Sequence, residues 1–366
     1  MRNELQNQTP VSYSAVETLS AMQSQEEIQQ VRSAKRPFLN YIHNFRAIAI
    51  LLIVAIHCYS ILTPGAEPIL IRRGTLLFMF ISGFLFHYLS DRFEKKAYWK
   101  KKLKYVIRPY LVISTPIILA RVAASSHSSD MLSLFPGFEQ LPVFLQVPLY
   151  YITGLHLVPL WFIPMLCFYY ILAPVFVALD KDGKIYYLLP LLLCLSLLVT
   201  RATEVYKMHL AFIHYLSVYL LGMFVSKNRD KALQATDNLW AVLAAAVAAV
   251  ACVSLLFKQK EIPFFEQFLF LQKLILCWGL IYGLWKFDKY VPKQLSKFSD
   301  MSFGIFFVHY YLLFLLTTAS YKGYIHLTTS FLSFFLIFVA DLAFSISVLF
   351  LIKKAFGDRS RSLIGY

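Results

Sequence analysis

The chain has 366 residues, of which 58% are hydrophobic and only 15% are charged, and its mean hydropathy is +0.60. Soluble domains average about 25% charged residues, so this composition excludes an ordinary soluble protein and indicates a polytopic membrane protein. We expect the net charge of +15 to reflect basic residues at the cytoplasmic face and their contact with anionic lipid, and not nucleic-acid binding.

Residues 1–38 precede the long apolar runs and are polar, rich in Gln, Ser and Glu. Such a segment cannot bury enough apolar surface to fold, so it predicts a disordered or loosely helical cytoplasmic tail. The apolar segment that follows is too long and begins too late to be a cleavable signal peptide. We therefore expect it to act as an uncleaved membrane anchor.

A hydrocarbon core about 30 Å thick requires roughly 20 apolar residues per helix. Runs of this kind recur through residues 39–352, and they predict an all-α bundle of about ten transmembrane helices. The predicted helices cover residues 39–62, 69–90, 105–124, 157–179, 185–200, 208–226, 236–257, 264–286, 303–320 and 327–352.

The distribution of Lys and Arg predicts the orientation of this bundle, because cytoplasmic loops retain basic residues. With the N-terminus inside, the inner segments hold 25 of the 35 basic residues and the outer segments hold nine. We therefore predict that both termini are cytoplasmic, with residues 353–366 as a short basic tail.

Arg46 and His57 lie in the first predicted helix with no polar residue between them. Eleven helical steps of 100° make three turns plus about 20°, so both side chains share one face, roughly 16 Å apart along the axis. Charged or ionisable groups cost at least a few kcal/mol each inside hydrocarbon. The pair is therefore a candidate catalytic site.

A basic run precedes the third predicted helix and contains Lys101, Lys104 and Arg108 at spacing i, i+3, i+7. One cationic stripe of this kind would hold the phosphates of a cytosolic nucleotide-like ligand. The alternative is that these residues anchor the loop to anionic headgroups. Both interpretations remain open.

Arg72 and Arg73 lead into the second predicted helix, which is interrupted at Ser82-Gly83. An arginine at the outer face would bind an anionic acceptor such as a phosphate-linked sugar. The small Ser-Gly pair also allows close approach of another helix. Trp161, near the outer end of the fourth helix, is either an interfacial belt residue or a surface on which a sugar stacks.

Ser299 and Ser302 precede the ninth predicted helix and suit the cytoplasmic start of a helix, and His309 follows one to two turns into it. His309 is either a packing hydrogen bonder or a substrate-binding group. Asp341 is expected to pair with a histidine or arginine across the bundle, and Lys273 to snorkel to the outer surface. The five cysteines show no metal-like spacing, so we predict no metal site.

Taken together in chain order, the motifs described above resemble those of the acyltransferase 3 family of bacterial membrane proteins, which O-acylate surface glycans and related molecules. The family's first helix typically reads Asp-x-Leu-Arg, then ten residues, then His; here His43-Asn44-Phe45-Arg46 is followed by His57. The other landmarks are Arg72 with Ser82-Gly83-Phe84, the basic run ending at Pro109-Tyr110, Trp161-Phe162, Leu221-Gly222-Met223, and Ser299, Ser302-Phe303-Gly304 and His309.

The resemblance implies acetyl-CoA, or another acyl-CoA such as succinyl-CoA, as donor. It implies a sugar hydroxyl of an exopolysaccharide, O-antigen or lipid-linked glycan as acceptor, and a location in the bacterial inner membrane. His57 would be the general base or a covalent acyl carrier, and Arg46 would orient the donor or stabilise charge. Lys101, Lys104 and Arg108 would hold the donor's phosphates. Binding of the acceptor would fall to the remaining candidates, Arg72, Arg73, Ser82, Trp161 and His309.

Two positions depart from the family pattern: His43 replaces the usual Asp, and Pro159 replaces a His often found before the Trp. The sequence predicts a stand-alone form without an extra-cytoplasmic esterase-like domain, acting alone or with other glycan-synthesis proteins. Two other classes stay open, a transporter or flippase of a lipid-linked glycan and a scaffold subunit of a glycan-synthesis complex. A carrier would favour internal repeats and broken helices.

Overall fold

The computed structural model describes residues 37–64, 67–199, 207–257 and 261–366. The chain divides into two units, Met1–Leu39 and Asn40–Tyr366, and the second contains every helix given below. The described residues form helices and no strand, which confirms the all-α prediction. Most of the predicted N-terminal tail, residues 1–36, lies outside the described residues.

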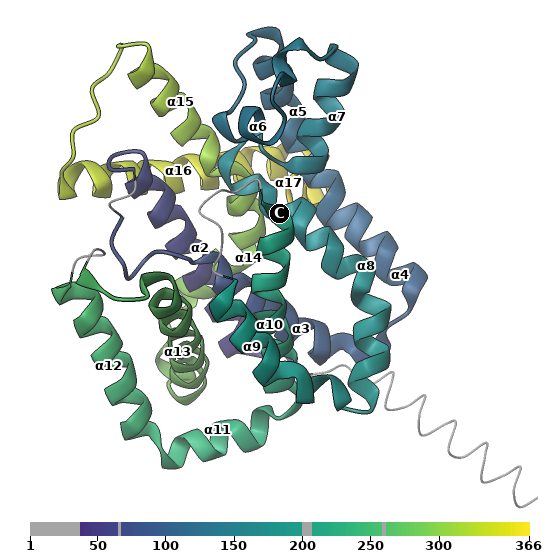
Figure 1. The fold of residues 1–366 in the computed structure, drawn as a ribbon, viewed down its shortest axis with the longest axis vertical. Coiled ribbons are helices and arrows are strands. Elements are labelled where there is room, and N and C mark those ends of the chain that lie inside the picture. The colour runs from purple at the N-terminus through teal and green to yellow at the C-terminus, as the bar shows by residue number, and fades with distance from the viewer. Residues whose placement is uncertain (1–36, 65–66, 200–206, 258–260) are drawn as a thin grey trace, which may run out of the picture. The chain divides into compact units, whose positions relative to one another are not determined.

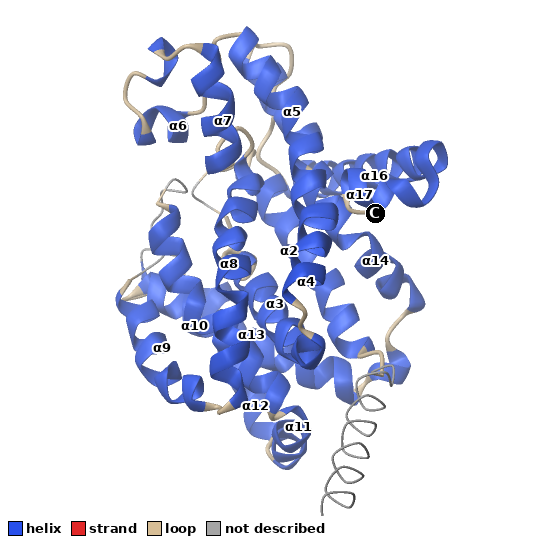
Figure 2. Ribbon diagram, turned by 90° about the vertical axis from the view of Figure 1, so that its right-hand side faces the viewer, coloured by secondary structure: helices blue, strands red, loops and turns tan. Residues whose placement is uncertain are grey.

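Helices of very different length succeed one another along the second unit (Figures 1 and 2). They are α2 (Asn40–Ser60), α3 (Thr75–Leu89), α4 (Lys95–Lys102), α5 (Arg108–Ala123), α6 (Ser129–Leu134), α7 (Val143–Thr153), α8 (Phe162–Lys181), α9 (Leu189–Leu198), α10 (Met208–Lys227), α11 (Arg229–Asn238), α12 (Trp240–Leu256), α13 (Phe265–Lys286), α14 (Lys293–Val308), α15 (Tyr310–Tyr321), α16 (Phe331–Phe356) and α17 (Ser360–Ile364).

Shorter turns join several of them. They are the 3₁₀ turns η1 (Ser90–Arg92), η3 (Phe138–Gln140), η4 (Val158–Trp161), η5 (Lys184–Leu188), η7 (Asp288–Tyr290) and η8 (Gly357–Arg359), and the π-helical turn η2 (Leu103–Ile107). The π turn ends beside Pro109 at the start of α5. Proline has no N–H to donate four residues back, so the regular α-helical ladder cannot continue through it.

The predicted number of ten spans is not confirmed. Within the described residues, seven helical segments are long and apolar enough to cross a membrane, or eight if α11 and α12, bent by 85°, form one span. Two other predicted spans are too short as continuous helices: α3 has 15 residues and α9 has ten. The hydropathy of a run predicts a span but does not determine where the helix within it is broken.

Helix α2 is central to the unit, packing against α3, α13, α14 and α16. Helices α3 and α10 pack closely against each other. A Cβ added to Gly83 would lie 1.9 Å from the backbone oxygen of Tyr219, and one added to Gly222 would lie 2.2 Å from that of Phe80. Only glycine fits at either position, so the predicted close approach at Ser82-Gly83 is confirmed.

The residues predicted as a C-terminal tail extend α16 and then form α17, which packs against α5. Ser360, Ser362 and Ile364 are buried there. The side chain of Arg361 lies over the Tyr105 ring, 4.9 Å from its centroid.

Candidate functional site

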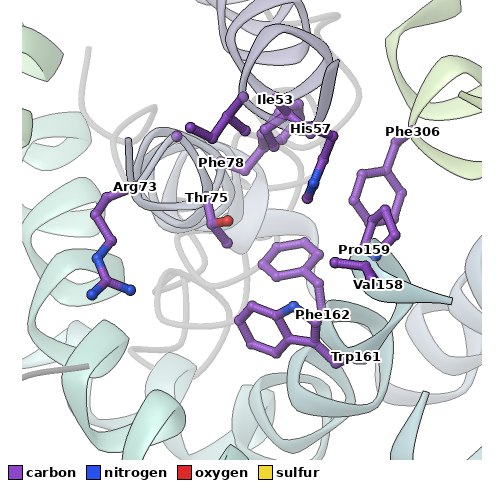
Figure 3. A pocket seen from close by; sticks show the side chains of 12 residues that line it. Ile53, His57, Arg73, Thr75, Phe78, Val158, Pro159, Trp161, Phe162 and Phe306 are labelled. Atoms are coloured by element: carbon purple, nitrogen blue, oxygen red, sulfur yellow. The ribbon is translucent and has the colours of Figure 1, made fainter. Parts of the chain in front are cut away.

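A cavity of ≈ 110 Å³ lies where α2, the start of α3 and the start of α8 meet (Figure 3). It brings together three of the residues singled out from the sequence, His57, Arg73 and Trp161. Its other lining residues are Ile53, Ile56, Gly74, Thr75, Phe78, Val158, Pro159, Phe162 and Phe306. Figure 3 shows the His57 ring directed toward Phe162 and Pro159. The Arg73 side chain lies on the other side of the view, beyond Thr75.

The wall that carries Trp161 is formed by a sharp reversal of the chain after α7. Gly154 ends α7 with φ +71°, and a Cβ there would lie 2.7 Å from the Leu160 oxygen. Only glycine combines this φ with such close backbone contact. The reversal leads directly into η4 and so places Pro159 and Trp161 at the cavity.

Two further aromatic side chains surround His57. The His309 ring lies with its centroid 5.5 Å from that of His57, and the Tyr310 ring lies edge-on to His57 at 5.3 Å. His309 stands at the junction of α14 and α15 and is fully buried. The structure therefore brings the two histidines into one cluster beside the cavity.

The hydrogen bonds of His309 define its tautomer. Its Nδ1 lies 3.0 Å from the carbonyl oxygens of Ile305 and Phe306. A carbonyl only accepts, so Nδ1 carries the proton and Nε2 keeps its lone pair. Nε2 is buried and has no hydrogen-bond partner among the described residues. His309 thus presents an unoccupied basic nitrogen next to His57.

Arg46 lies three turns before His57 on α2 and does not line this cavity. Its Nη2 donates to Ser302 Oγ on α14 at 3.0 Å, and Ser302 Oγ donates in turn to the Ser299 carbonyl at 2.7 Å. Ser299 Oγ donates to the His43 carbonyl on α2. These bonds hold α14 against α2 and fix the direction of the Arg46 side chain.

The prediction that Ser299 and Ser302 mark the start of a helix is wrong. Helix α14 begins at Lys293, so both serines lie in its interior and face α2. Position 43, where the family usually has Asp, is His43, and its side chain contacts α14. His43 Nε2 lies 3.1 Å from the Ser296 carbonyl and 3.3 Å from Asp300 Oδ1, so α14 supplies the carboxylate near this end of α2.

Arg72 and Arg73 have different partners. Arg72 Nη2 donates to Glu67 Oε2 at 2.6 Å and does not line the cavity. Arg73, with φ +62°, directs its Nη2 to Glu266 Oε2 in the first turn of α13. This ion pair is half-buried and links the loop before α3 to α13. Of the two, only Arg73 reaches the cavity.

Two other predicted side chains occupy places unlike those expected. Lys273 does not snorkel: it is fully buried, and its Nζ donates to the Leu70 carbonyl at 2.9 Å and to Gln272 Oε1 at 2.7 Å. Asp341 is fully buried on α16, but its neighbour is Cys58, whose Sγ lies 4.0 Å from Oδ2. The expectation that Asp341 pairs with a histidine or arginine has no counterpart among the described contacts.

Lys101, Lys104 and Arg108 are all exposed, away from the His57 cavity, and Ser82 on α3 does not line the cavity either. The π-helical turn between Lys101 and Arg108 changes the rotation per residue, so the three cations do not keep the phase of one α-helical stripe. Lys102, which is not part of the predicted stripe, is half-buried, with Nζ 4.3 Å from the Tyr170 ring centroid.

Sequence reasoning missed several lining residues, among them Thr75, Phe78 and Phe306. Thr75 follows Arg73 by two positions, and Phe306 precedes His309 by one helical turn. Pro159 also lines the cavity, although it replaces the family's usual histidine. The only available signal for these residues was proximity to motifs already identified.

Comparison with known proteins gives one positive result. A family model described as an acyltransferase domain matches residues 39–350, from the start of α2 to near the end of α16. A search of curated proteins and a search of solved structures found no match. The domain and the long apolar helices together support a multi-pass membrane acyltransferase. The chain belongs to the acyltransferase 3 family.

Proposed function

We propose that this protein transfers an acetyl group from acetyl-CoA to a hydroxyl of an exopolysaccharide, O-antigen or lipid-linked glycan. The observation that carries the proposal is the cavity in which His57, Arg73 and Trp161 meet in a chain of the acyltransferase 3 family. An imidazole for proton transfer and an indole for a sugar face suit acyl transfer to a sugar, and Arg73, which already pairs with Glu266, adds a positioned guanidinium at the edge of the cavity.

The reaction needs one base and one acid. His57 takes the proton of the acceptor hydroxyl as its oxygen attacks the thioester carbonyl carbon. The new C–O bond forms, the C–S bond breaks, and the proton passes from His57 to the departing CoA thiolate. A two-step route, in which His57 first carries the acyl group, uses the same residue and gives the same products.

The donor is proposed to enter from the cytoplasmic side, with both termini cytoplasmic. Lys101, Lys104 and Arg108 offer exposed cations near the start of α5, where phosphates would bind by charge-assisted contacts. Arg46 orients the donor from its fixed position on α2, where Ser302 holds it. The small size of the His57 cavity, ≈ 110 Å³, favours a short acyl group such as acetyl over a long chain.

The test is transfer of radiolabelled acetyl from acetyl-CoA to de-O-acylated surface glycan by the purified protein in detergent. His57→Ala should abolish transfer while leaving expression and thermal stability close to wild type. His209→Ala is the matched control, because His209 is exposed on α10 and does not line the cavity. Mass spectrometry of the glycan from cells with and without the gene identifies the acyl group independently.

Unchanged transfer by His57→Ala would overturn the catalytic assignment. No transfer by the wild-type protein, combined with a glycan of unchanged mass in cells lacking the gene, would overturn the proposed reaction. A transporter would show a third pattern: unmodified glycan retained on the cytoplasmic side, with no dependence on acetyl-CoA.

A further inference from the structure

A second cavity adjoins the first. Its volume is ≈ 310 Å³, and it is built by the C-terminal end of α5, the start of α6 and the turn after α7. The lining residues are Arg121, His127, Ser128, Ser129, Asp130, Leu155 and Val158. Val158 lines both cavities, so they lie on either side of one residue. None of the sequence motifs pointed to this place.

Arg121 is held in one position at this cavity. Its Nε donates to the His156 carbonyl at 2.7 Å and its Nη1 to the Ser126 carbonyl at 3.0 Å. The guanidinium also lies over the Phe314 ring, 5.2 Å from the centroid. Three contacts fix the group without any carboxylate partner among the described residues. A ligand therefore meets a preorganised cation with remaining N–H donors.

Two acceptors on the same wall are unused. Asp130 is half-buried and makes no hydrogen bond or ion pair with any described residue, and the exposed Ser129 hydroxyl makes none either. Burial raises the pKa of the Asp130 carboxyl. A half-buried carboxyl group without a donor is costly, and a ligand hydroxyl would relieve this cost.

His127 adds a neutral polar group. Its Nδ1 lies 3.0 Å from the Tyr150 hydroxyl, and its ring stands edge-on to Phe138 with centroids 5.0 Å apart. Burial lowers the pKa of His127, with Arg121 acting in the same direction and Glu139 opposing. The imidazole is therefore uncharged at neutral pH and presents its Nε2 edge as a further hydrogen-bonding group.

The combination excludes simple ions as the natural occupant. Asp130 disfavours an anion and Arg121 disfavours a cation, while Leu155 and Val158 provide an apolar surface. A sugar ring offers what this wall requires: several hydroxyls that donate and accept, no net charge, and apolar C–H faces. We propose that the cavity binds a neutral sugar unit of the acceptor glycan, adjacent to the unit whose hydroxyl enters the His57 cavity.

The proposal rests on the proposed function and adds an acceptor subsite to it. It predicts that the enzyme distinguishes an oligosaccharide from a single sugar. An oligosaccharide fills both cavities, so it gains the contacts of Asp130 and Ser129. A monosaccharide fills the first cavity alone and gains nothing from them.

The experiment measures acetyl transfer to short oligosaccharides cut from de-O-acylated surface glycan, and to the monosaccharide that carries the acylated hydroxyl. Asp130→Asn is expected to raise the KM for oligosaccharide about 10-fold or more, the loss expected for a hydrogen bond to a charged group. The KM for acetyl-CoA and the rate with monosaccharide should change less than about twofold. Ser129→Ala should act in the same direction and has no structural partner to lose.

Asp358→Asn is the matched control, because Asp358 is exposed in η8, far along the chain from either cavity. An unchanged KM for oligosaccharide in both Asp130→Asn and Ser129→Ala would overturn the subsite, and so would an equal change with monosaccharide. Binding of the oligosaccharides, followed by Trp fluorescence, separates the two proposals. Weakened binding by Asp130→Asn without transfer by the wild type would refute the reaction and support the subsite.

Discussion

His57 on α2 and His309 at the start of α15 place their rings 5.5 Å apart, although they come from opposite ends of the chain. His309 donates from Nδ1 to backbone carbonyls of α14, so its Nε2 lone pair remains available. The pair therefore places a second imidazole next to the one that lines the cavity. His309 is fixed by its own helix, whereas His57 lines the cavity directly.

His309→Asn is expected to lower kcat by about 100-fold, in the range of general acid–base contributions. The Asn amide can still donate to the carbonyls of Ile305 and Phe306, as Nδ1 does, but it has no group at the place of Nε2. Thermal stability in detergent should therefore stay near that of the wild type. A wild-type kcat in this variant would show that the Nε2 position takes no part in transfer.

Arg46→Gln and Ser302→Ala are expected to be non-additive. Ser302 acts by holding Arg46, so the double variant should lose no more kcat/KM than Arg46→Gln alone. Ser302→Ala by itself should cost several-fold, because the guanidinium loses its fixed direction. Ser320→Ala on α15 serves as the control. Simple addition of the two effects in a double-mutant cycle would contradict the assigned contact.

Gly83→Ala and Gly222→Ala are each expected to prevent stable folding or to lower the melting temperature severely. The new methyl group would overlap backbone atoms of the facing helix, which cannot move like a side chain. Gly283→Ala in α13 is the matched control, because nothing lies within 4 Å of its Cβ position. There, a Gly→Ala change in a helix should stabilise by up to about 1 kcal/mol. Equal behaviour of the three variants would contradict the helix contact.

His156 is expected to make the protein less stable in acid. It lies in the turn after α7, fully buried, and burial lowers its pKa from 6.5 to about 3. Between about pH 3 and pH 6.5, His156 binds a proton in the unfolded chain but not in the folded protein. The free energy of unfolding therefore decreases as the pH falls below 6.5, and the slope of this decrease approaches about 1.4 kcal/mol per pH unit.

The measurement for His156 is the melting temperature in detergent between pH 7 and pH 5, for wild type and His156→Gln. The variant should show the smaller decrease on acidification, whatever its stability at pH 7. His326→Gln, at an exposed position in the loop before α16, should follow the wild type. Parallel curves for all three proteins would mean that His156 does not titrate during unfolding.

The helices themselves were largely predictable from local properties of the chain. Apolar runs placed α2, α8, α10, α13 and α16 close to their observed limits, since run length and hydropathy depend only on neighbouring residues. The order of motifs was enough to indicate the family that the matched domain confirms. The number of spans was less accessible, because the apolar runs 69–90 and 185–200 hold continuous α-helices of only 15 and ten residues, α3 and α9.

The sequence by itself determined that the chain is helical, that Arg46 and His57 share α2, and which family it belongs to. The tertiary structure decided that His309, Arg73 and Trp161 approach His57, that Ser302 holds Arg46, and that Arg121 and Asp130 line a second cavity. The physical reason is that lipid is as apolar as a protein core, so hydropathy does not tell which face of a membrane helix packs inward. Only contacts between distant segments supply that information.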